Sequence, residues 1–265
     1  MYENFFKHNL GLKEYITGNR FIDICEQNRV TFCKTDNISE FHNTNQNVFV
    51  THNSDYHIDH NRIKLAPQAL KKWFAQNKDI DDSRVIGIPI GLENMTKRFT
   101  LASDLGRFSS QPKNGLQKSL YIEKVAKLHK EHSDLVYLNI NPNTFLNERR
   151  YVLSLFQNRE WVTHKSNISW KEYYDDIASH KFVFSPRGNG VDCHRTWEAL
   201  YLRTIPIVKT SLCMNEFKDL PILFINKWEE IDYDFLKDKY EEMTSREYDL
   251  SKMKISYWRD VIKER

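Results

Sequence analysis

Short apolar runs alternate with helix-like segments along most of this chain, and no other feature constrains the fold as strongly. The helix-like segments lie at residues 64–77, 119–132, 145–157, 169–180, from about 192, at 232–245 and at the C-terminal end. The strand-like runs lie at 29–33, 48–50, 84–94, 136–140, 161–164, 182–185, 205–208 and 221–225. Strands that alternate with helices of about 10–15 residues form βαβ units with parallel sheets. The alternation therefore predicts an α/β fold.

The chain length predicts two domains. A chain of 265 residues is long for one core and comfortable for two domains of roughly 100–150 residues each. Residues 95–118 lose periodicity and collect Ser, Gly, Gln and Pro, which is typical of a linker. We predict a first domain at residues 1–112 and a second at 113–252. We expect a C-terminal helix at about 253–265 to pack back on the first domain.

Composition excludes several classes of protein. The chain is 40% hydrophobic and 28% charged, which is typical of an ordered globular protein. The net charge is only +3, and basic residues are interleaved with acids. A nucleic-acid-binding protein usually has a dense basic stripe, so no nucleic-acid partner is expected. No apolar window is long enough to span a membrane, and the first residues lack the apolar core of a signal peptide. The four cysteines are read as reduced thiols, and a cytoplasmic location is expected.

Polar clusters directly follow several of the predicted strands. In parallel α/β sheets, ligands bind in the crevice outside the carboxyl ends of the strands. Residues at these positions are therefore the candidates for a functional site. They lie at 52–55, 91–94, 139–144 and 185–192.

The cluster at 185–192 opens a candidate βαβ unit with an anion site. Gly188 and Gly190 let the backbone approach a ligand closely. The next helix begins near Asp192, and its free N–H groups attract anions. Arg195 and Glu198 lie three residues apart on one face of that helix. Arginine suits a diphosphate, and a carboxylate suits ribose hydroxyls. Alternatively, these two side chains pair with each other or with neighbouring side chains on a helix surface. The G-x-G-x-x-G and P-loop patterns are absent, which argues against a Rossmann dehydrogenase or a P-loop ATPase.

The stretch FVFSPRGNGVDCHRTWEALYLRTIPIV resembles the nucleotide-sugar-binding half of exostosin-like glycosyltransferases. Their pattern is a strand, then S-P-x-G-x-G-x-D-x-x-R-x-W/F-E-A-L, a small turn and I-P-I/V-V. VFVTHNSDY and KWFAQN…VIGIPIGLEN look like the acceptor-side domain of short relatives in bacteria and large viruses. One departure is Arg203, which replaces the glycine that relatives often have in this turn, so a different helix cap is expected.

The resemblance implies a GT-B fold, with two Rossmann-like doubly wound domains facing across a cleft. It also implies an inverting transferase that moves a sugar from a nucleotide sugar, most simply a UDP-sugar, to a hydroxyl of a glycan acceptor. The short relatives resemble xylosyltransferases, so xylose is the favoured sugar. No bound metal or other cofactor is expected. Carried over residue by residue, Arg195 would hold the diphosphate and Glu198 the ribose. The remaining donor-binding candidates are Arg149, Ser185, Arg187, Gly188, Asn189 and Gly190.

Such a reaction needs a base that takes the proton of the acceptor hydroxyl, and the facing domain should supply it. Asp55 is the first candidate, Glu93 the second and His52 the third. Alternatively, Asp55 caps a turn or the N-terminus of a helix, Glu93 is a surface loop residue, and His52 is an ordinary hydrogen-bonded histidine. The Asp-x-Asp letters at 79–81 and 232–234 fit caps better than metal ligands, and the His and Asp residues at 52–60 match no known metal spacing.

Two other functions remain open on sequence grounds. One is a nucleotide- or carbohydrate-binding module without catalysis. The other is a transferase that uses a different nucleotide donor, such as a sulfotransferase, although the sulfate-donor loop of P-loop type is missing. The sequence carries no signal for an oligomeric state.

Overall fold

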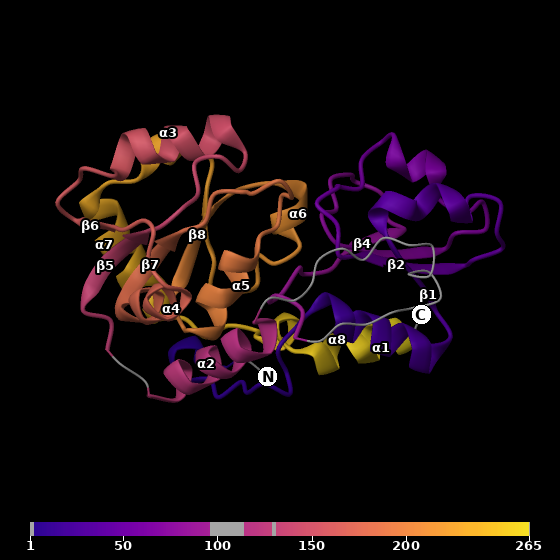
Figure 1. Cartoon of the computed structure of the whole chain (residues 1–265), viewed down its shortest axis with the longest axis horizontal. Helices are drawn as coiled ribbons and strands as arrows, with labels where there is room; N and C mark the ends of the chain where they lie inside the picture. Colours follow the sequence, from indigo (N-terminus) through magenta and orange to yellow (C-terminus); the bar gives the residue numbers. More distant parts are fainter. Residues whose placement is uncertain (1–2, 96–113, 129–130, 265) are drawn as a thin grey trace.

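The computed structural model describes residues 3–95, 114–128 and 131–264 of the chain. They form two lobes that lie side by side, each built around a parallel β-sheet (Figure 1). The prediction of an α/β fold with two parallel-sheet domains is therefore confirmed. The expected linker falls mainly on residues 96–113, which lie outside the described residues.

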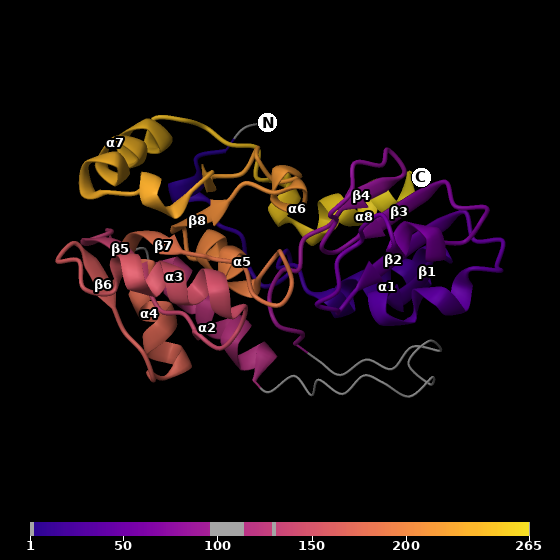
Figure 2. The same cartoon turned by 90° about the horizontal axis from the view of Figure 1, so that it is seen from above.

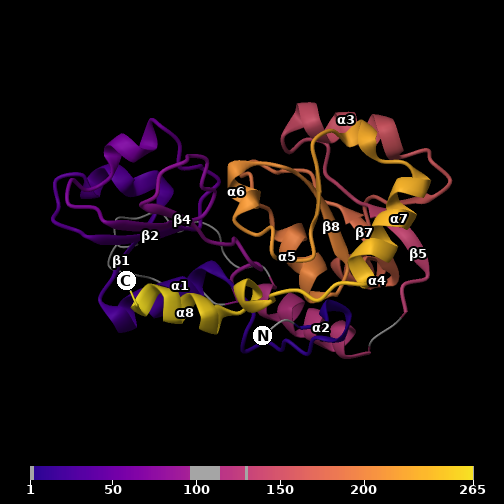
Figure 3. The same cartoon turned by 180° about the vertical axis from the view of Figure 1, so that it is seen from behind.

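The first lobe holds a four-stranded parallel sheet in the order β1-β2-β3-β4. These strands are Thr31–Lys34, Val48–His52, Lys72–Ala75 and Val85–Gly87. Helices α1 (Gly18–Asn28) and α8 (Ile255–Lys263) run along one face of the sheet (Figures 1 and 3). Two 3-10 helices, at Thr35–Phe41 and Arg62–Leu65, supply side chains to the core on the other face. The sheet is therefore covered on both sides, as a buried parallel sheet requires.

The helix predicted at 64–77 is wrong. A short 3-10 helix ends at Leu65, and β3 begins at Lys72. Trp73 and Phe74 are both fully buried but belong to different cores, one on each face of the sheet. Pairing with β2 and β4 on either side decides the conformation here, because a short apolar run has no decisive periodicity of its own.

The second lobe holds a five-stranded parallel sheet in the order β6-β5-β7-β8-β9. In chain order, β5 to β9 are Asp134–Leu138, Val162–His164, His180–Phe184, Ile205–Lys209 and Leu223–Ile225. Its helices α2 to α7 are Gly115–Leu128, Leu146–Phe156, Trp170–Ser179, His194–Tyr201, Leu212–Asn215 and Tyr233–Thr244. Short 3-10 helices lie at Phe5–Lys7, Trp228–Glu230 and Ser251–Met253. The strand order reverses between β5 and β7, and in doubly wound sheets ligands bind at that reversal.

Both ends of the described chain cross to the other lobe. Helix α8 lies beside α1 of the first lobe in all three views (Figures 1, 2 and 3), and the backbone N–H of Ile255 donates to the carbonyl of Glu14 at 3.0 Å. At the other end, Glu3 pairs with Tyr248 of the second lobe in an isolated bridge. Residues near both ends therefore tie the lobes together.

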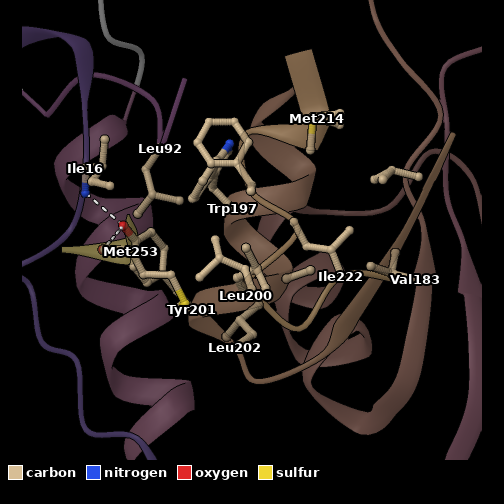
Figure 4. Close-up of a cluster of buried hydrophobic side chains, with 14 of the residues drawn as sticks. Ile16, Leu92, Val183, Trp197, Leu200, Tyr201, Leu202, Met214, Ile222 and Met253 are labelled. Carbon is tan, nitrogen blue, oxygen red and sulfur yellow. Dashed lines mark hydrogen bonds between the residues drawn. The ribbon is translucent and has the colours of Figure 1, made fainter. Parts of the chain in front are cut away.

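A shared apolar cluster continues across the junction of the lobes (Figure 4). Ile16 and Leu92 meet Trp197 and Tyr201 of α5, and all four are buried. The Tyr201 hydroxyl donates to the carbonyl of Met253 and accepts from the backbone N–H of Ile16, both at 2.9 Å. The helix that carries Arg195 and Glu198 is therefore anchored on its apolar side by residues from both ends of the chain.

The expectation of a different cap at Arg203 is wrong. Arg203 has a φ of 67°, which is the left-handed conformation that glycine would adopt there. Its guanidinium Nη2 donates to the carbonyl of His8 at 2.6 Å, and the side chain is buried. The backbone of Arg203 thus has a conformation that is unfavourable for a residue with a side chain. Its side chain holds the N-terminal segment against the second lobe.

Candidate functional site

Three hollows are lined by residues of the loop that follows β7, residues 185–192, or of helix α5 directly after it. The largest, about 620 Å³, lies at the carboxyl ends of the first-lobe strands, and we call it the first-lobe cleft. A second, about 310 Å³, lies in the second lobe, and we call it the arginine pocket. The third, about 220 Å³, lies at the ends of β7 and β8. The sequence clusters at 52–55, 91–94, 139–144 and 185–192 all contribute residues to these hollows.

The arginine pocket sits at the reversal point of the second sheet. Asn139 and Asn141 follow β5, the strand beside the reversal. Arg195 comes from α5, which follows β7 on the other side of it. The remaining lining residues are Arg149 from α3 and Asn167, Ile168, Trp170 and Tyr173 from the segment after β6 and from α4. The topology thus brings together residues from separate βα turns, as is usual for a ligand site in this class of sheet.

Two arginines dominate this pocket, Arg149, which is buried, and Arg195, which is partly exposed. Arg149 is only 6% exposed, whereas its neighbour Arg150 is exposed, so the surface position that the sequence allowed for Arg149 is excluded. Arg149 donates from Nε to the carbonyl of Arg187 at 2.8 Å. Burial lowers the pKa of Arg149, and the positive charge of Arg195 lowers it further. Two cations so placed repel each other and favour an anion between them.

One nitrogen of Arg195 lacks a partner in the described protein, although its guanidinium also bonds Tyr173. Its Nε is buried and has no hydrogen-bond partner among the described residues. In that part of the chain, no carboxylate lies within ion-pair distance of Arg149 or Arg195. An ion pair of Arg195 with Glu198, which the spacing allowed, is therefore not formed, whereas Glu198 does bond neighbouring side chains, as the same alternative allowed.

Glu198 instead accepts hydrogen bonds from two tyrosines. The hydroxyl of Tyr174 donates to its Oε1 at 2.8 Å, and that of Tyr173 to its Oε2 at 3.1 Å. Burial, with the Glu198 charge next, raises the pKa of both tyrosines, so both hydroxyls stay protonated and donate. Glu198 keeps lone pairs for further donors, and its contact with a ribose stays a prediction. Sequence reasoning missed Tyr173, because on an amphipathic helix it reads as a packing residue.

The glycine loop is closely packed on both sides. A Cβ at Gly188 would lie 3.3 Å from Nη2 of Arg149. A Cβ at Gly190 would lie 2.8 Å from Nδ2 of Asn77, a contact too short for any side chain to make without movement. Gly188 thus borders the arginine pocket, whereas Gly190 lets the two lobes approach each other.

Glu198 is not among the residues that line the arginine pocket, and three other predicted donor ligands also lie outside it. Ser185 is buried, bonds Thr196 Oγ1 at 2.9 Å and lines the third hollow. Arg187 lines the same hollow, with its guanidinium 4.1 Å from the centre of the Phe145 ring. Asn189 lines the first-lobe cleft. The structure thus distributes the predicted donor loop over two hollows, the first-lobe cleft and the third hollow.

Asp55 and Glu93 both line the first-lobe cleft. Asp55 is exposed, and its Oδ2 accepts from Nδ2 of Asn189 at 3.3 Å, across the junction of the lobes. Glu93 is paired with Lys118 of α2 at 2.6 Å. Gln76 also lines the cleft. Sequence reasoning missed it because it was assigned to a helix, although it directly follows β3 and the rule used for the other strands would have found it.

His52 has the contacts of an ordinary hydrogen-bonded histidine. It is 1% exposed, and its Nδ1 accepts from the backbone N–H of Asn53 at 2.7 Å. Its Nε2 must then carry the proton, which it donates to the carbonyl of Pro89 at 3.0 Å. Burial lowers the pKa of His52 to about 4. Both ring nitrogens are therefore engaged, and neither is placed to take a proton from a substrate.

We expect His52 to make the fold less stable in acid. The folded pKa of His52, about 4, lies below the ordinary 6.5, so the unfolded chain binds more protons than the folded one between these pH values. The free energy of unfolding therefore decreases as the pH is lowered through this range. By pH 5 the loss is about 2 kcal/mol. Burial of His8 also makes the protein less stable in acid, whereas buried Asp192, whose pKa is raised to about 6, makes it more stable there.

Urea unfolding at pH 7.5 and pH 5 measures this effect. The free energy of unfolding should decrease less between these pH values in His52→Gln than in the wild type. The exposed control His60→Gln should match the wild type, and an unchanged acid loss in His52→Gln would contradict the assignment.

Neither a metal cluster nor a membrane span emerges from the described ranges. No three His, Cys, Asp or Glu side chains gather there in a way that could hold a metal ion. Asp232 of the second Asp-x-Asp sequence caps α7, accepting from the N–H of Phe235 at 2.8 Å, as the capping alternative predicted. Within these ranges, no helix combines the length and the apolar character needed to cross a bilayer.

In the comparison with known protein families, the match covers most of the second lobe and little of the first. Residues 136–265 match the family model described as the RXYLT1 C-terminal domain, which is xylosyltransferase-related. This range includes every residue that lines the arginine pocket. The match supports the glycosyltransferase resemblance seen in the sequence, while membership of the exostosin-like family stays a prediction. No curated protein matches the chain at a significant level.

Solved structures show a distant likeness. The crystal structure of an α1,3-fucosyltransferase is 13% identical, with a TM-score of 0.46 over 86% of this chain and 75% of that one. The same enzyme type with GDP-fucose is 13% identical, with a TM-score of 0.43 over 83% and 78%. AviGT4, a glycosyltransferase involved in avilamycin A biosynthesis, is 12% identical, with a TM-score of 0.33 over 87% and 72%.

Proposed function

We propose that this chain is a glycosyltransferase that binds a nucleoside-diphosphate sugar in the arginine pocket. The observation that carries the proposal is the pair of buried Arg149 and half-buried Arg195, which lies at the reversal point of a parallel sheet without a carboxylate in ion-pair distance among the described residues. A diphosphate supplies the negative charge that this pair lacks, through charge-assisted and often bidentate hydrogen bonds.

The other lining residues suit the nucleoside part of such a donor. Ile168 and Trp170 offer apolar surface to a base, and Asn139 and Asn167 offer amide groups. The carboxylate of Glu198, directly behind Tyr173, would accept from ribose hydroxyls. We propose UDP as the nucleotide and xylose as the sugar. The xylosyltransferase-related family match supports the choice of sugar.

In the proposed reaction, an acceptor hydroxyl bound in the first-lobe cleft attacks the anomeric carbon of the donor. The new glycosidic bond forms as the bond between the anomeric carbon and the diphosphate oxygen breaks, and the diphosphate leaves with the electron pair. Arg149 and Arg195 stabilise the charge that develops on it. One displacement of this kind inverts the configuration at the anomeric carbon, and no metal is needed if the arginines carry the charge.

We propose Asp55 as the base that takes the acceptor proton. It is exposed in the cleft and contacts Asn189 of the donor-side loop. Glu93 is the second candidate, and its ion pair with Lys118 leaves its carboxylate less available for a proton. A binding module without catalysis would use the same arginine pocket but would not need a carboxylate facing the donor loop.

A panel of nucleotides tests the proposed function. Wild-type protein is heated with UDP, GDP, CMP and ADP, and then with the sugars of the nucleotide that stabilises it. We expect UDP at 100 times its dissociation constant to add about 2.7 kcal/mol to the free energy of unfolding. We expect UDP-xylose to be consumed in the presence of a glycan acceptor. Absence of any nucleotide effect would contradict the proposal, and binding without turnover of any donor would favour the binding module.

A further inference from the structure

Asp192 is a buried carboxylate that the proposed reaction does not use. It is 2% exposed and lies two residues before α5, at the Asp of the G-x-G-x-D sequence. Its Oδ2 accepts from the backbone N–H of Ile90 in the first lobe at 2.7 Å. Its two oxygens both lie 2.9 Å from Nε1 of Trp197 in the second lobe. One side chain thus joins a backbone group of one lobe to a core side chain of the other.

Asn77 makes a second connection at the same place. Its Oδ1 accepts from the backbone N–H of Asp192 at 2.9 Å, and its Nδ2 donates to the carbonyl of Ser54 at 3.2 Å. Asn77 is fully buried and has a φ of 57°, in the left-handed region. The side chain of Asn77 also fills the space that a Cβ on Gly190 would need. The two lobes therefore fit together closely at this point.

These contacts reach both first-lobe segments that carry a candidate base. Ser54 directly precedes Asp55, and Ile90 lies shortly before Glu93. We propose that Asp192 is a positioning residue that, together with Asn77, holds the donor-side loop 185–192 in register with the acceptor-side segments 52–56 and 90–94. The purpose of this register, aligning donor and base, rests on the proposed function, whereas the connection itself does not.

The neighbours of Asp192 require an acceptor and not an amide. Ile90 N–H donates to Oδ2, and Trp197 Nε1–H lies 2.9 Å from both oxygens, so in Asp192→Asn the NH₂ group would face Trp197 in either orientation, and Ile90 N–H would at best donate to a neutral oxygen, a weaker acceptor than a carboxylate. Two titratable groups interact with the charge of Asp192. They are His194, whose ring bonds the carbonyl of Gly91 at 2.7 Å, and the buried thiol of Cys213. Burial raises the pKa of Asp192 to about 6, against the N–H donors, which lower it.

Hydrogen exchange in Asp192→Asn tests the connection without any ligand. We expect the amide of Ile90 to exchange at least about tenfold faster than in the wild type, and the indole N–H resonance of Trp197 to move. Asp238→Asn is the matched control, because Asp238 is exposed on α7 and the same charge is removed. Asp238→Asn should change neither signal. An Ile90 amide that stays as protected in folded Asp192→Asn as in the wild type would overturn the proposal.

A pH titration of the wild type gives the same test without a variant, in case Asp192→Asn does not fold. The indole N–H resonance of Trp197, assigned by its loss in Trp197→Phe, should titrate with a midpoint near 6, and Ile90 exchange should accelerate over the same range after correction for the intrinsic pH dependence of exchange. A Trp197 signal that does not move between pH 7.5 and pH 3 would refute the contact between these two side chains.

UDP separates this inference from the proposed function. We expect Asp192→Asn to bind UDP within about threefold of the wild type, because Asp192 does not line the arginine pocket. In the wild type, UDP should slow hydrogen exchange at 52–56 and 90–94, and in Asp192→Asn this response should be lost. An equal response in both proteins would overturn the positioning role. Absence of UDP binding to the wild type would instead count against the proposed function, and the Ile90 and Trp197 signals would then decide the inference.

Discussion

Arg195→Ala should weaken the binding of UDP by at least about 100-fold. A hydrogen bond to a charged group contributes about 1.5–3 kcal/mol, and a guanidinium usually makes two such bonds to a diphosphate. The loss of even one strong hydrogen bond, together with the positive charge, lowers the binding free energy by about 3 kcal/mol. This corresponds to a decrease in affinity of more than about 100-fold. Isothermal titration calorimetry with UDP on the folded variant measures it directly.

The chain offers matched controls for this result. Arg149→Ala should weaken UDP binding as Arg195→Ala does, whereas Arg150→Ala, which removes the exposed neighbour, should leave it unchanged. The affinity of Arg195→Lys for UDP should lie between those of the wild type and Arg195→Ala, because lysine keeps the positive charge but lacks the planar guanidinium that makes two parallel hydrogen bonds. If Arg195→Ala binds UDP as the wild type does, the diphosphate does not lie in the arginine pocket.

Asp55→Asn should lower kcat for sugar transfer by about 10²–10⁴-fold, the usual contribution of a general base. Its affinity for UDP should stay close to that of the wild type, because Asp55 lies in the first-lobe cleft and not in the arginine pocket. Steady-state kinetics with the donor selected by the nucleotide panel, together with calorimetry on the same preparation, separates the two quantities.

Two other carboxylates control for the identity of the base. Asp36→Asn removes another acid from the lining of the same cleft and should have little effect on kcat. Glu93→Gln should reduce kcat less than Asp55→Asn does, because Glu93 is committed to Lys118. If Glu93→Gln is inactive while Asp55→Asn keeps full activity, the two roles must be exchanged.

The rule that ligand groups follow strands located much of this site from the sequence. Residues 139–144 and 185–192 were selected because they come directly after apolar runs, and residues from both clusters border the hollows of the second lobe. The rule works here because strands buried on both faces are nearly continuous apolar runs, so their carboxyl ends are visible in the sequence. For the same reason the rule selected Asp55 and Glu93 for the first-lobe cleft.

The same rule failed wherever a strand was not recognised. The run around Trp73 was interpreted as part of a helix, so Gln76 and Asn77 at the end of β3 were never considered. Asn77 is one of the residues that join the two lobes, and its contact with Asp192 went unseen with it. Short runs of apolar residues fit helix and strand equally well, and only pairing with neighbouring strands decides between them.

Local patterns in the sequence determined the α/β class, most of the element order and the placement of Arg195 and Glu198 on one helix face, because these depend on periodicity within a few residues. Only the tertiary structure decided that Arg149 lies buried near Arg195, that Glu198 is held by two tyrosines, and that His52 is enclosed by backbone groups. The hydrogen bond between Asp192 and Ile90 is likewise seen only in the tertiary structure. Each of these contacts joins segments that are separated along the chain, and burial sets their charges and hydrogen bonds, so no local spacing in the sequence reports them.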